Sequence, residues 1–339
     1  MKIAFFIRHF GERGTEVSVY SYAHYNETML GNQSIIIGFK KETYQKYGLV
    51  FQDDVFQRFA SRFRVILVDS FNDVNRTLLQ EGVDVYYTQT HGAIERFPYG
   101  DVTACTYVVH CVFETRQPHG DMYMAISQQL NERFGTSCPV VPYIVDIPES
   151  NENLRQQLGI DENAIVFGRH GALDTFDIQI AKDSVIEVAT NHPEIHFVFM
   201  NTYRFCDLPN VHYLDKSLDP LQKRKFINTC DAYLHARSDG ETFGLAVAEF
   251  AVCKKPVLAF EHCTDDAHFR ILGDKIIKYT CQRDLVKKLT SFQRGMYDMT
   301  ANGYMQFTPQ NVMPAFKLYV CRPKPKPLNW LNVHKNRSF

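Results

Sequence analysis

The sequence contains no long apolar segment and carries almost no net charge. We find no run that approaches the roughly 18 apolar residues needed for a membrane-spanning helix. The net charge of −1 over 339 residues gives no overall electrostatic reason to expect nucleic acid or a charged membrane as a partner. The chain opens with a strand-like segment, residues 3–7, and shows no signal-peptide pattern. We therefore expect a cytoplasmic protein without stable membrane insertion.

Motifs for metals and for nicotinamide cofactors are also missing. The nine cysteines are scattered and none forms a C-x-x-C pair, so we expect free thiols in a reducing compartment and no structural zinc. No Asp-x-Asp motif stands between strands at a catalytic position. The loop at residues 9–16 lacks the pattern G-x-G-x-x-G, and Lys40 and Lys41 stand where a dinucleotide-binding fold would place an acidic residue. We expect no metal and no cofactor.

Short apolar strands alternate with helical patterns along both halves of the chain, which is typical of parallel sheets covered on both faces. In the first half, strands are predicted at residues 3–7, 34–39, 65–68, 83–88, 103–110, 122–127 and 140–145, with helices at 17–30, 55–63, 73–82 and 127–135. In the second half, strands are predicted at 164–167, 196–200, 211–214, 232–237, 256–260 and 275–279, with helices at 176–191, 219–230, 243–253, 265–272, 283–294 and 309–320. The predicted fold class is α/β: two Rossmann-like, doubly wound parallel-sheet domains that face each other across a cleft.

The most informative motif runs from Glu241 to Glu249. A predicted strand and a polar break precede Glu241, so this residue is expected on a loop at the carboxyl end of a strand. Glu249 is expected about one turn into the following helix. Gly244 allows the backbone to approach a ligand closely, and free N–H groups at the helix start suit a phosphate. The two carboxylates could therefore bind hydroxyls on two sugar rings that a diphosphate joins.

The Glu-x7-Glu spacing, with Phe243, Gly244 and Leu245 after the first glutamate, resembles the retaining glycosyltransferases of the two-Rossmann-domain (GT-B) type, particularly family 4. The resemblance extends over roughly residues 1–320. It implies a metal-independent, hexosyltransferase-like enzyme that uses a nucleotide-diphosphate sugar as co-substrate. The sugar would pass, with retention, to a glycan, protein or lipid acceptor. Neither the nucleotide nor the acceptor can be determined from these residues.

The resemblance also implies a division of the chain into four segments. Residues 1–146 would form a Rossmann-like acceptor domain, and residues 147–308 would form the Rossmann-like nucleotide-sugar donor domain. Residues 309–320 would form a helix that crosses back to the N-terminal domain. Residues 321–339 would form a basic, proline-rich tail.

Site roles follow from the same resemblance. Glu241 would bind hydroxyls of the donor sugar, and Glu249 would bind the ribose diol. The donor-binding run between them consists of Thr242, Phe243, Gly244 and Leu245, whose backbone N–H groups would hold sugar and phosphate. His110, at the end of a predicted strand, corresponds to a histidine that faces the donor sugar in this family.

Two further segments are expected to contact the diphosphate. Arg169 ends the first strand of the second half, and its guanidinium can stabilise the departing phosphate as a fork donor. His170 and Gly171 follow it directly. Across the cleft, the donor-binding residues of the first loop are Arg13, Gly14 and Thr15.

The chain departs from the family at one position. The family usually places a lysine about five residues after the arginine, whereas this chain has Asp174 and Thr175 there. The missing lysine motivates one alternative to the transferase, a non-catalytic protein that binds a sugar nucleotide or a glycan. A second alternative, which has the same two-Rossmann-domain fold and also uses sugar nucleotides, is a sugar-nucleotide 2-epimerase.

Overall fold

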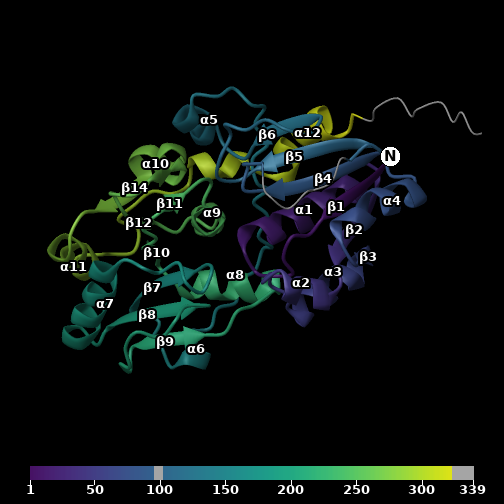
Figure 1. The fold of residues 1–339 in the computed structure, drawn as a ribbon. Helices are drawn as coiled ribbons and strands as arrows, with labels where there is room; N and C mark the ends of the chain where they lie inside the picture. The colour runs from purple at the N-terminus through teal and green to yellow at the C-terminus, as the bar shows by residue number, and fades with distance from the viewer. Residues whose placement is uncertain (95–101, 323–339) are drawn as a thin grey trace, which may run out of the picture.

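The computed structural model describes residues 1–94 and 102–322, so most of the predicted tail at 321–339 lies outside the described residues. The α/β prediction is confirmed: two six-stranded sheets are present, and every strand pair within them is parallel (Figure 1). Each sheet follows the same doubly wound order. In such sheets ligands bind beyond the carboxyl ends of the strands, where the strand order reverses.

The first sheet has the order β3-β2-β1-β4-β5-β6. Its strands are β1 (Lys2–Phe6), β2 (Gln33–Phe39), β3 (Arg64–Val68), β4 (Val85–Thr90), β5 (Thr106–Cys111) and β6 (Met122–Ala125). The helices of this half are α1 (Gly14–Thr28), α2 (Lys41–Lys46), α3 (Asp53–Arg62), α4 (Phe71–Glu81) and α5 (Gln128–Phe134). The order reverses between β1 and β4, beside the start of α1.

The second sheet has the order β14-β12-β10-β7-β8-β9. Its strands are β7 (Ile165–His170), β8 (Ile195–Met200), β9 (Val211–Leu214), β10 (Ala232–His235), β12 (Val257–Phe260) and β14 (Ile276–Tyr279), and a separate pair is formed by β11 (Gly240–Glu241) and β13 (Asp265–Asp266). The helices are α6 (Arg155–Leu158), α7 (Gln179–Asn191), α8 (Pro220–Thr229), α9 (Leu245–Val252), α10 (Ala267–Leu272) and α11 (Gln282–Thr290), with short 3₁₀ turns at Gly273–Lys275 and Gly303–Gln306. Here the order reverses between β7, which ends at His170, and β10, which leads to the Glu241 loop.

The last described helix, α12 (Pro309–Val320), packs against the first sheet rather than the second (Figure 1). Phe316 stacks on Tyr22 of α1 with ring centroids 4.9 Å apart, and it also contacts Phe5 of β1. These aromatic side chains are fully buried, so their removal from water favours this position of the helix.

One predicted strand is absent. Residues 140–145 form no strand; only Val140 makes an isolated bridge, to Ala125 of β6. Pro142 has no N–H to donate to a sheet, and its carbonyl accepts a hydrogen bond from the Tyr22 hydroxyl at 2.7 Å. Beyond its single bridge to β6, the segment is held by the Tyr22 hydroxyl of α1 and by a backbone hydrogen bond from Val145 to Phe307, and the first sheet ends at β6.

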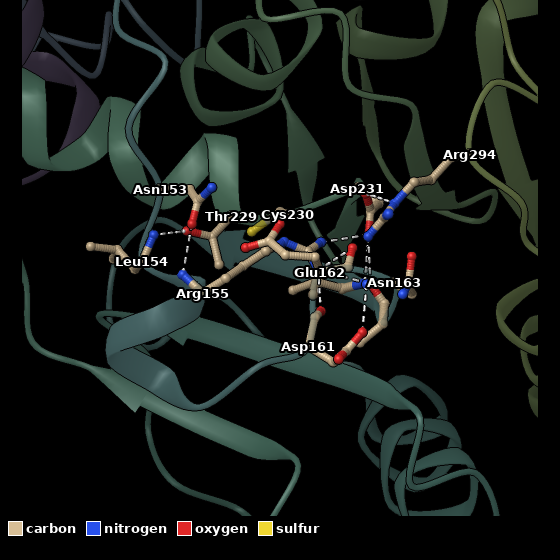
Figure 2. A network of polar contacts seen from close by, with 12 residues as sticks. Asn153, Leu154, Arg155, Asp161, Glu162, Asn163, Thr229, Cys230, Asp231 and Arg294 are labelled. Atoms are coloured by element: carbon tan, nitrogen blue, oxygen red, sulfur yellow. Dashed lines mark hydrogen bonds and ion pairs between the residues drawn. The ribbon is translucent and has the colours of Figure 1, made fainter.

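A buried ionic network fastens the connection between the two halves to the second sheet (Figure 2). Arg155 of α6 is 4% exposed and donates to Asp231 Oδ2 at 2.9 Å and to the carbonyl of Ala164 at 2.9 Å. Arg294 donates to the other oxygen of Asp231 at 2.8 Å. Because Asp231 directly precedes β10 and also accepts the N–H of Val166 in β7, the network fixes the starts of two central strands.

Candidate active site

A cavity of about 470 Å³ lies between the two halves of the chain, at the carboxyl ends of their strands. This volume is in the range of small-molecule sites. All of the residues predicted for the site except His110 line it: Arg13, Gly14, Thr15, Arg169, His170, Gly171, Glu241, Thr242, Phe243, Gly244, Leu245 and Glu249. Segments that are far apart in the sequence are thus brought to one site.

Two helices from opposite halves begin at this cavity. α1 starts at Gly14 and α9 starts at Leu245, and a Cβ placed on Gly14 would lie 4.0 Å from the Cβ of Leu245. Gly244, directly before α9, has a φ of 83°, which a side chain would strain, and a Cβ there would lie 3.1 Å from the Tyr304 hydroxyl. Helix starts present free N–H groups and a partial positive charge, so this meeting point suits an anion.

Glu241 stands at the cavity wall as an ionised carboxylate. Its Oε1 lies 3.3 Å from Nε2 of His235, and its Oε2 accepts a hydrogen bond from Arg237 at 3.3 Å. Burial by itself would raise the pKa of Glu241, but His235 and Arg237 outweigh it, and the pKa falls below its usual range. His235 is in turn packed against His268, with ring centroids 4.7 Å apart, so the carboxylate is supported from behind.

Glu249 lies on α9 at the other end of the cavity. Lys223 donates to its Oε1 at 2.7 Å, and Nε2 of His170 lies 3.0 Å from its Oε2. Burial acts to raise the pKa of Glu249, but Lys223 and His170 lower it to about 2. Apart from His170, no donor contacts the buried Oε2 in the described part of the chain. A carboxylate oxygen can accept more than one hydrogen bond, so Oε2 can also accept one from a ligand hydroxyl.

Arg169 reaches the wall, but its guanidinium is already engaged. One terminal nitrogen donates to the Asn201 carbonyl at 2.9 Å and to the Thr202 hydroxyl at 2.6 Å. The other donates to the Ala172 carbonyl at 2.7 Å and to the Thr175 hydroxyl at 2.5 Å. Arg169 is 2% exposed and joins the loops that follow β7 and β8. In this arrangement Arg169 holds the loops that form the cavity wall, and its guanidinium N–H groups are not directed into the cavity.

Other cations face the cavity from its rim. The Arg13 side chain is 66% exposed and lies 3.5 Å from Asp174, the residue that replaces the lysine of the family pattern. Lys216, which follows β9, crosses to the first half and lies 2.6 Å from Glu12 and 3.0 Å from Asp54. The described arrangement is therefore closed by ion pairs that span the cleft.

His110 does not line the cavity. It is fully buried within β5, and its Nδ1 lies 2.6 Å from the Tyr87 hydroxyl. Burial lowers the pKa of His110 to about 3, so the ring is neutral. Val112 and Phe113, a few residues later, line the cavity in its place.

The residues that line the cavity and were not expected from the sequence include Lys216, Lys223, His235 and Arg237. His235 and Arg237 lie within the strand and loop that lead to Glu241. Their proximity to Glu241 in the sequence could have predicted that they contact it. The sequence around Lys216 and Lys223 contains no comparable signal, because the residues that they contact lie in other helices and loops. Within residues 1–94 and 102–322, no group of three or more His, Cys, Asp or Glu side chains is placed to hold a metal, and no helix is long and apolar enough to cross a membrane.

The same two-sheet arrangement occurs in solved glycosyltransferases of the GT-B type. HepE from Anabaena, determined with UDP and glucose, matches with a TM-score of 0.67 and 16% identity, over 94% of this chain and 99% of that chain. A glycosyltransferase from Rickettsia africae matches with a TM-score of 0.62 and 12% identity, over 93% and 94% of the two chains. A candidate UDP-N-acetylglucosamine 2-epimerase from Listeria monocytogenes matches with a TM-score of 0.60 and 14% identity, over 93% and 95%.

These likenesses show that the chain has the GT-B fold. No family model and no curated protein matches its sequence.

Proposed function

We propose that this chain is a glycosyltransferase that uses a nucleotide-diphosphate sugar, with a UDP-sugar as the first candidate. The observation that carries the proposal is the meeting of two helix starts, at Gly14 and Leu245, in a cavity that also holds Glu241 and Glu249. The helix starts suit a diphosphate, and a carboxylate on each side suits a sugar ring. HepE, which shares the fold, was solved with UDP-glucose, and this supports UDP as the nucleotide.

In this proposal the donor lies with its ribose toward Glu249 and its sugar toward Glu241. Oε2 of Glu249, which also contacts His170, accepts a hydrogen bond from a ribose hydroxyl, while Lys223 keeps the carboxylate ionised. Glu241 accepts hydrogen bonds from hydroxyls of the transferred sugar. The N–H groups of residues 243–245 and of Gly14 and Thr15 contact the diphosphate.

The transfer step that we propose is retaining and needs no metal. The acceptor oxygen forms a bond to the anomeric carbon on the face from which the diphosphate leaves. The bond from that carbon to the diphosphate breaks, and the proton of the acceptor hydroxyl passes to a diphosphate oxygen. Arg13 and the two helix starts stabilise the negative charge that grows on the leaving group.

The test compares the wild type with Glu241→Gln and Glu249→Gln in thermal unfolding with UDP and with UDP-, GDP-, ADP- and dTDP-sugars. A ligand that binds only the folded chain raises its melting temperature. We expect a UDP-sugar to stabilise the wild type and to release its sugar slowly to water. Glu249→Gln should weaken stabilisation by UDP itself, whereas Glu241→Gln should mainly lose the extra stabilisation from the sugar and the slow release.

Glu261→Gln is a matched control, because Glu261 lies outside the cavity and pairs with Lys278 on the surface. No stabilisation by any sugar nucleotide would overturn the proposal. Binding without release or transfer would favour the non-catalytic protein. The second candidate function, 2-epimerisation, is suggested by the Listeria structure with the same fold. Its sign would be a C2 epimer of UDP-N-acetylglucosamine that forms without any acceptor.

A further inference from the structure

Tyr143 lies in the segment that leads from the first sheet to the second, and the backbone is held on both sides of it. The N–H of Val141 donates to the Ala125 carbonyl of β6 at 2.9 Å, and the N–H of Val145 donates to the Phe307 carbonyl at 2.8 Å. These hydrogen bonds fasten the segment to elements of both halves, so the position of the Tyr143 ring between the halves is fixed.

The Tyr143 ring lies where the two helix starts meet. It lines the cavity between the halves, and only 4% of the residue is exposed. Its centroid is 5.3 Å from that of Phe243, which stands two residues before α9. A Cβ placed on Gly14, the first residue of α1, would lie 3.8 Å from Cε2 of Tyr143. Because Cε2 is bonded to the carbon that bears the hydroxyl, the hydroxyl also lies near the start of α1.

The Tyr143 hydroxyl is buried and has no hydrogen-bond partner in the part of the chain that the structure describes. Two other buried tyrosines of this region do have one: Tyr233 donates to the His170 carbonyl at 3.0 Å, and Tyr304 donates to the Phe243 carbonyl. A buried hydroxyl that donates to nothing is costly to the folded chain. In the wall of a cavity, such a hydroxyl can donate to a bound molecule.

The hydroxyl keeps its proton near neutral pH. Burial, and after it the charges of Glu16 and Glu241, raise the pKa of Tyr143 above its usual range. Neither of these carboxylates accepts a hydrogen bond from Tyr143 in the described structure. The two helix starts beside the hydroxyl attract an anionic group to the same place, and the oxygens of such a group are acceptors for its proton.

We infer that Tyr143 is a further donor-binding residue, whose hydroxyl donates a hydrogen bond to an oxygen of the diphosphate. This inference rests on the proposed glycosyltransferase function, and it adds a contact from the segment between the two halves to those from α1 and α9. A hydrogen bond to a charged oxygen is stronger than one between neutral groups. The contact therefore helps to hold the donor and stabilises the negative charge that grows on the leaving group.

Tyr143→Phe removes the hydroxyl and keeps the ring, and calorimetric titration compares the binding of UDP, UDP-glucose and uridine. We expect the Kd of UDP and that of UDP-glucose to rise by the same factor, about tenfold or more, because one charge-assisted hydrogen bond is lost. Uridine has no phosphate, so its Kd should not change. An unchanged Kd for UDP would overturn the inference. A rise for UDP-glucose alone would also overturn it, because the hydroxyl would then contact the sugar.

Urea unfolding without a ligand tests whether the hydroxyl lacks a partner. Tyr143→Phe should leave the stability unchanged or raise it. Tyr44→Phe is the matched control: Tyr44 is fully buried, its hydroxyl donates to the Ile7 carbonyl at 2.6 Å, and it is not among the described residues of the cavity wall. This control should lower the stability and leave the Kd of UDP unchanged. A loss in Tyr143→Phe as large as in Tyr44→Phe would show that the hydroxyl is already paired, and would overturn the inference.

Failure of this inference and failure of the proposed function give different results. If no sugar nucleotide binds the wild type, the proposed function is wrong and this inference falls with it. If the wild type binds UDP and UDP-glucose and Glu249→Gln weakens UDP binding, the proposed donor site stands. Unchanged UDP binding by Tyr143→Phe would then remove only Tyr143 from that site.

Discussion

Lys223 and Glu249 form a buried ion pair that lines the cavity between the two halves, with Lys223 Nζ 2.7 Å from Glu249 Oε1. Only 18% and 6% of the two side chains are exposed. Burial alone would raise the pKa of Glu249, but Lys223 and His170 lower it from 4.5 to about 2. A carboxyl group with a lowered pKa in the folded state stabilises the fold fully above its unfolded pKa, and this contribution is lost as the pH falls toward 2.

We expect Lys223→Met to lower the free energy of unfolding by about 3 kcal/mol near neutral pH, because Glu249 keeps a buried charge with one partner fewer. The difference from the wild type should shrink at about pH 3, where Glu249 of the variant takes up a proton. Urea unfolding at the two pH values measures it. Lys225→Met is the control on the same helix: its partner Glu152 is 69% exposed, and the change should be below about 0.5 kcal/mol. An equal loss at both pH values would contradict the expectation.

A second prediction concerns Arg169. Lysine has a single nitrogen and cannot bridge the Asn201–Thr202 and Ala172–Thr175 loops, so Arg169→Lys should destabilise the chain by about 2–3 kcal/mol. UDP binding should weaken as well, because Gly171, Ala172, Thr175 and Asn201 line the cavity. Thermal unfolding with and without UDP separates the two effects.

Arg204→Lys is the control for this substitution, since Arg204 is 64% exposed and, within the described residues, its ion pair is with the exposed Asp207. Unchanged stability of Arg169→Lys together with weaker UDP binding would show that Arg169 serves the phosphate directly. That result would return the residue to the role expected from the family resemblance.

The fold followed from the sequence because each strand is a short apolar run between turn residues, and the alternation of strands and helices repeats along the chain. The predicted helix at 309–320 coincides with α12. The predicted strand at 140–145 was wrong: the segment is apolar and buried, but it meets the sheet only at the Val140 bridge, and the Pro142 carbonyl accepts a hydrogen bond from Tyr22 of α1. Apolar content alone does not distinguish a strand from a segment that is buried in another way.

The site was predictable where its residues adjoin strand ends, as at Arg13–Thr15, Arg169–Gly171 and the Glu241 loop. Side-chain direction and long-range pairing were not predictable. His110 stands near the end of β5, yet its ring is enclosed beside Tyr87. The ion pair between Lys223 and Glu249 joins two helices that are separated in the sequence. The local sequence around Lys223 therefore does not predict that Glu249 is its partner.

The last prediction concerns Glu16, whose burial raises its pKa from 4.5 to about 7. An acid with a raised pKa in the folded state binds its proton more tightly there than in the unfolded chain, so stability is greatest at low pH and falls as the pH rises from 4.5 toward 7. Glu16→Gln removes this cost while it keeps the shape. The variant should gain up to about 3 kcal/mol over the wild type at about pH 8, and little at about pH 5, in urea unfolding. Glu42→Gln, at an exposed position on α2, should change little at either pH. A gain for Glu16→Gln that is equal at both values would mean that the Glu16 carboxylate is already well solvated or paired.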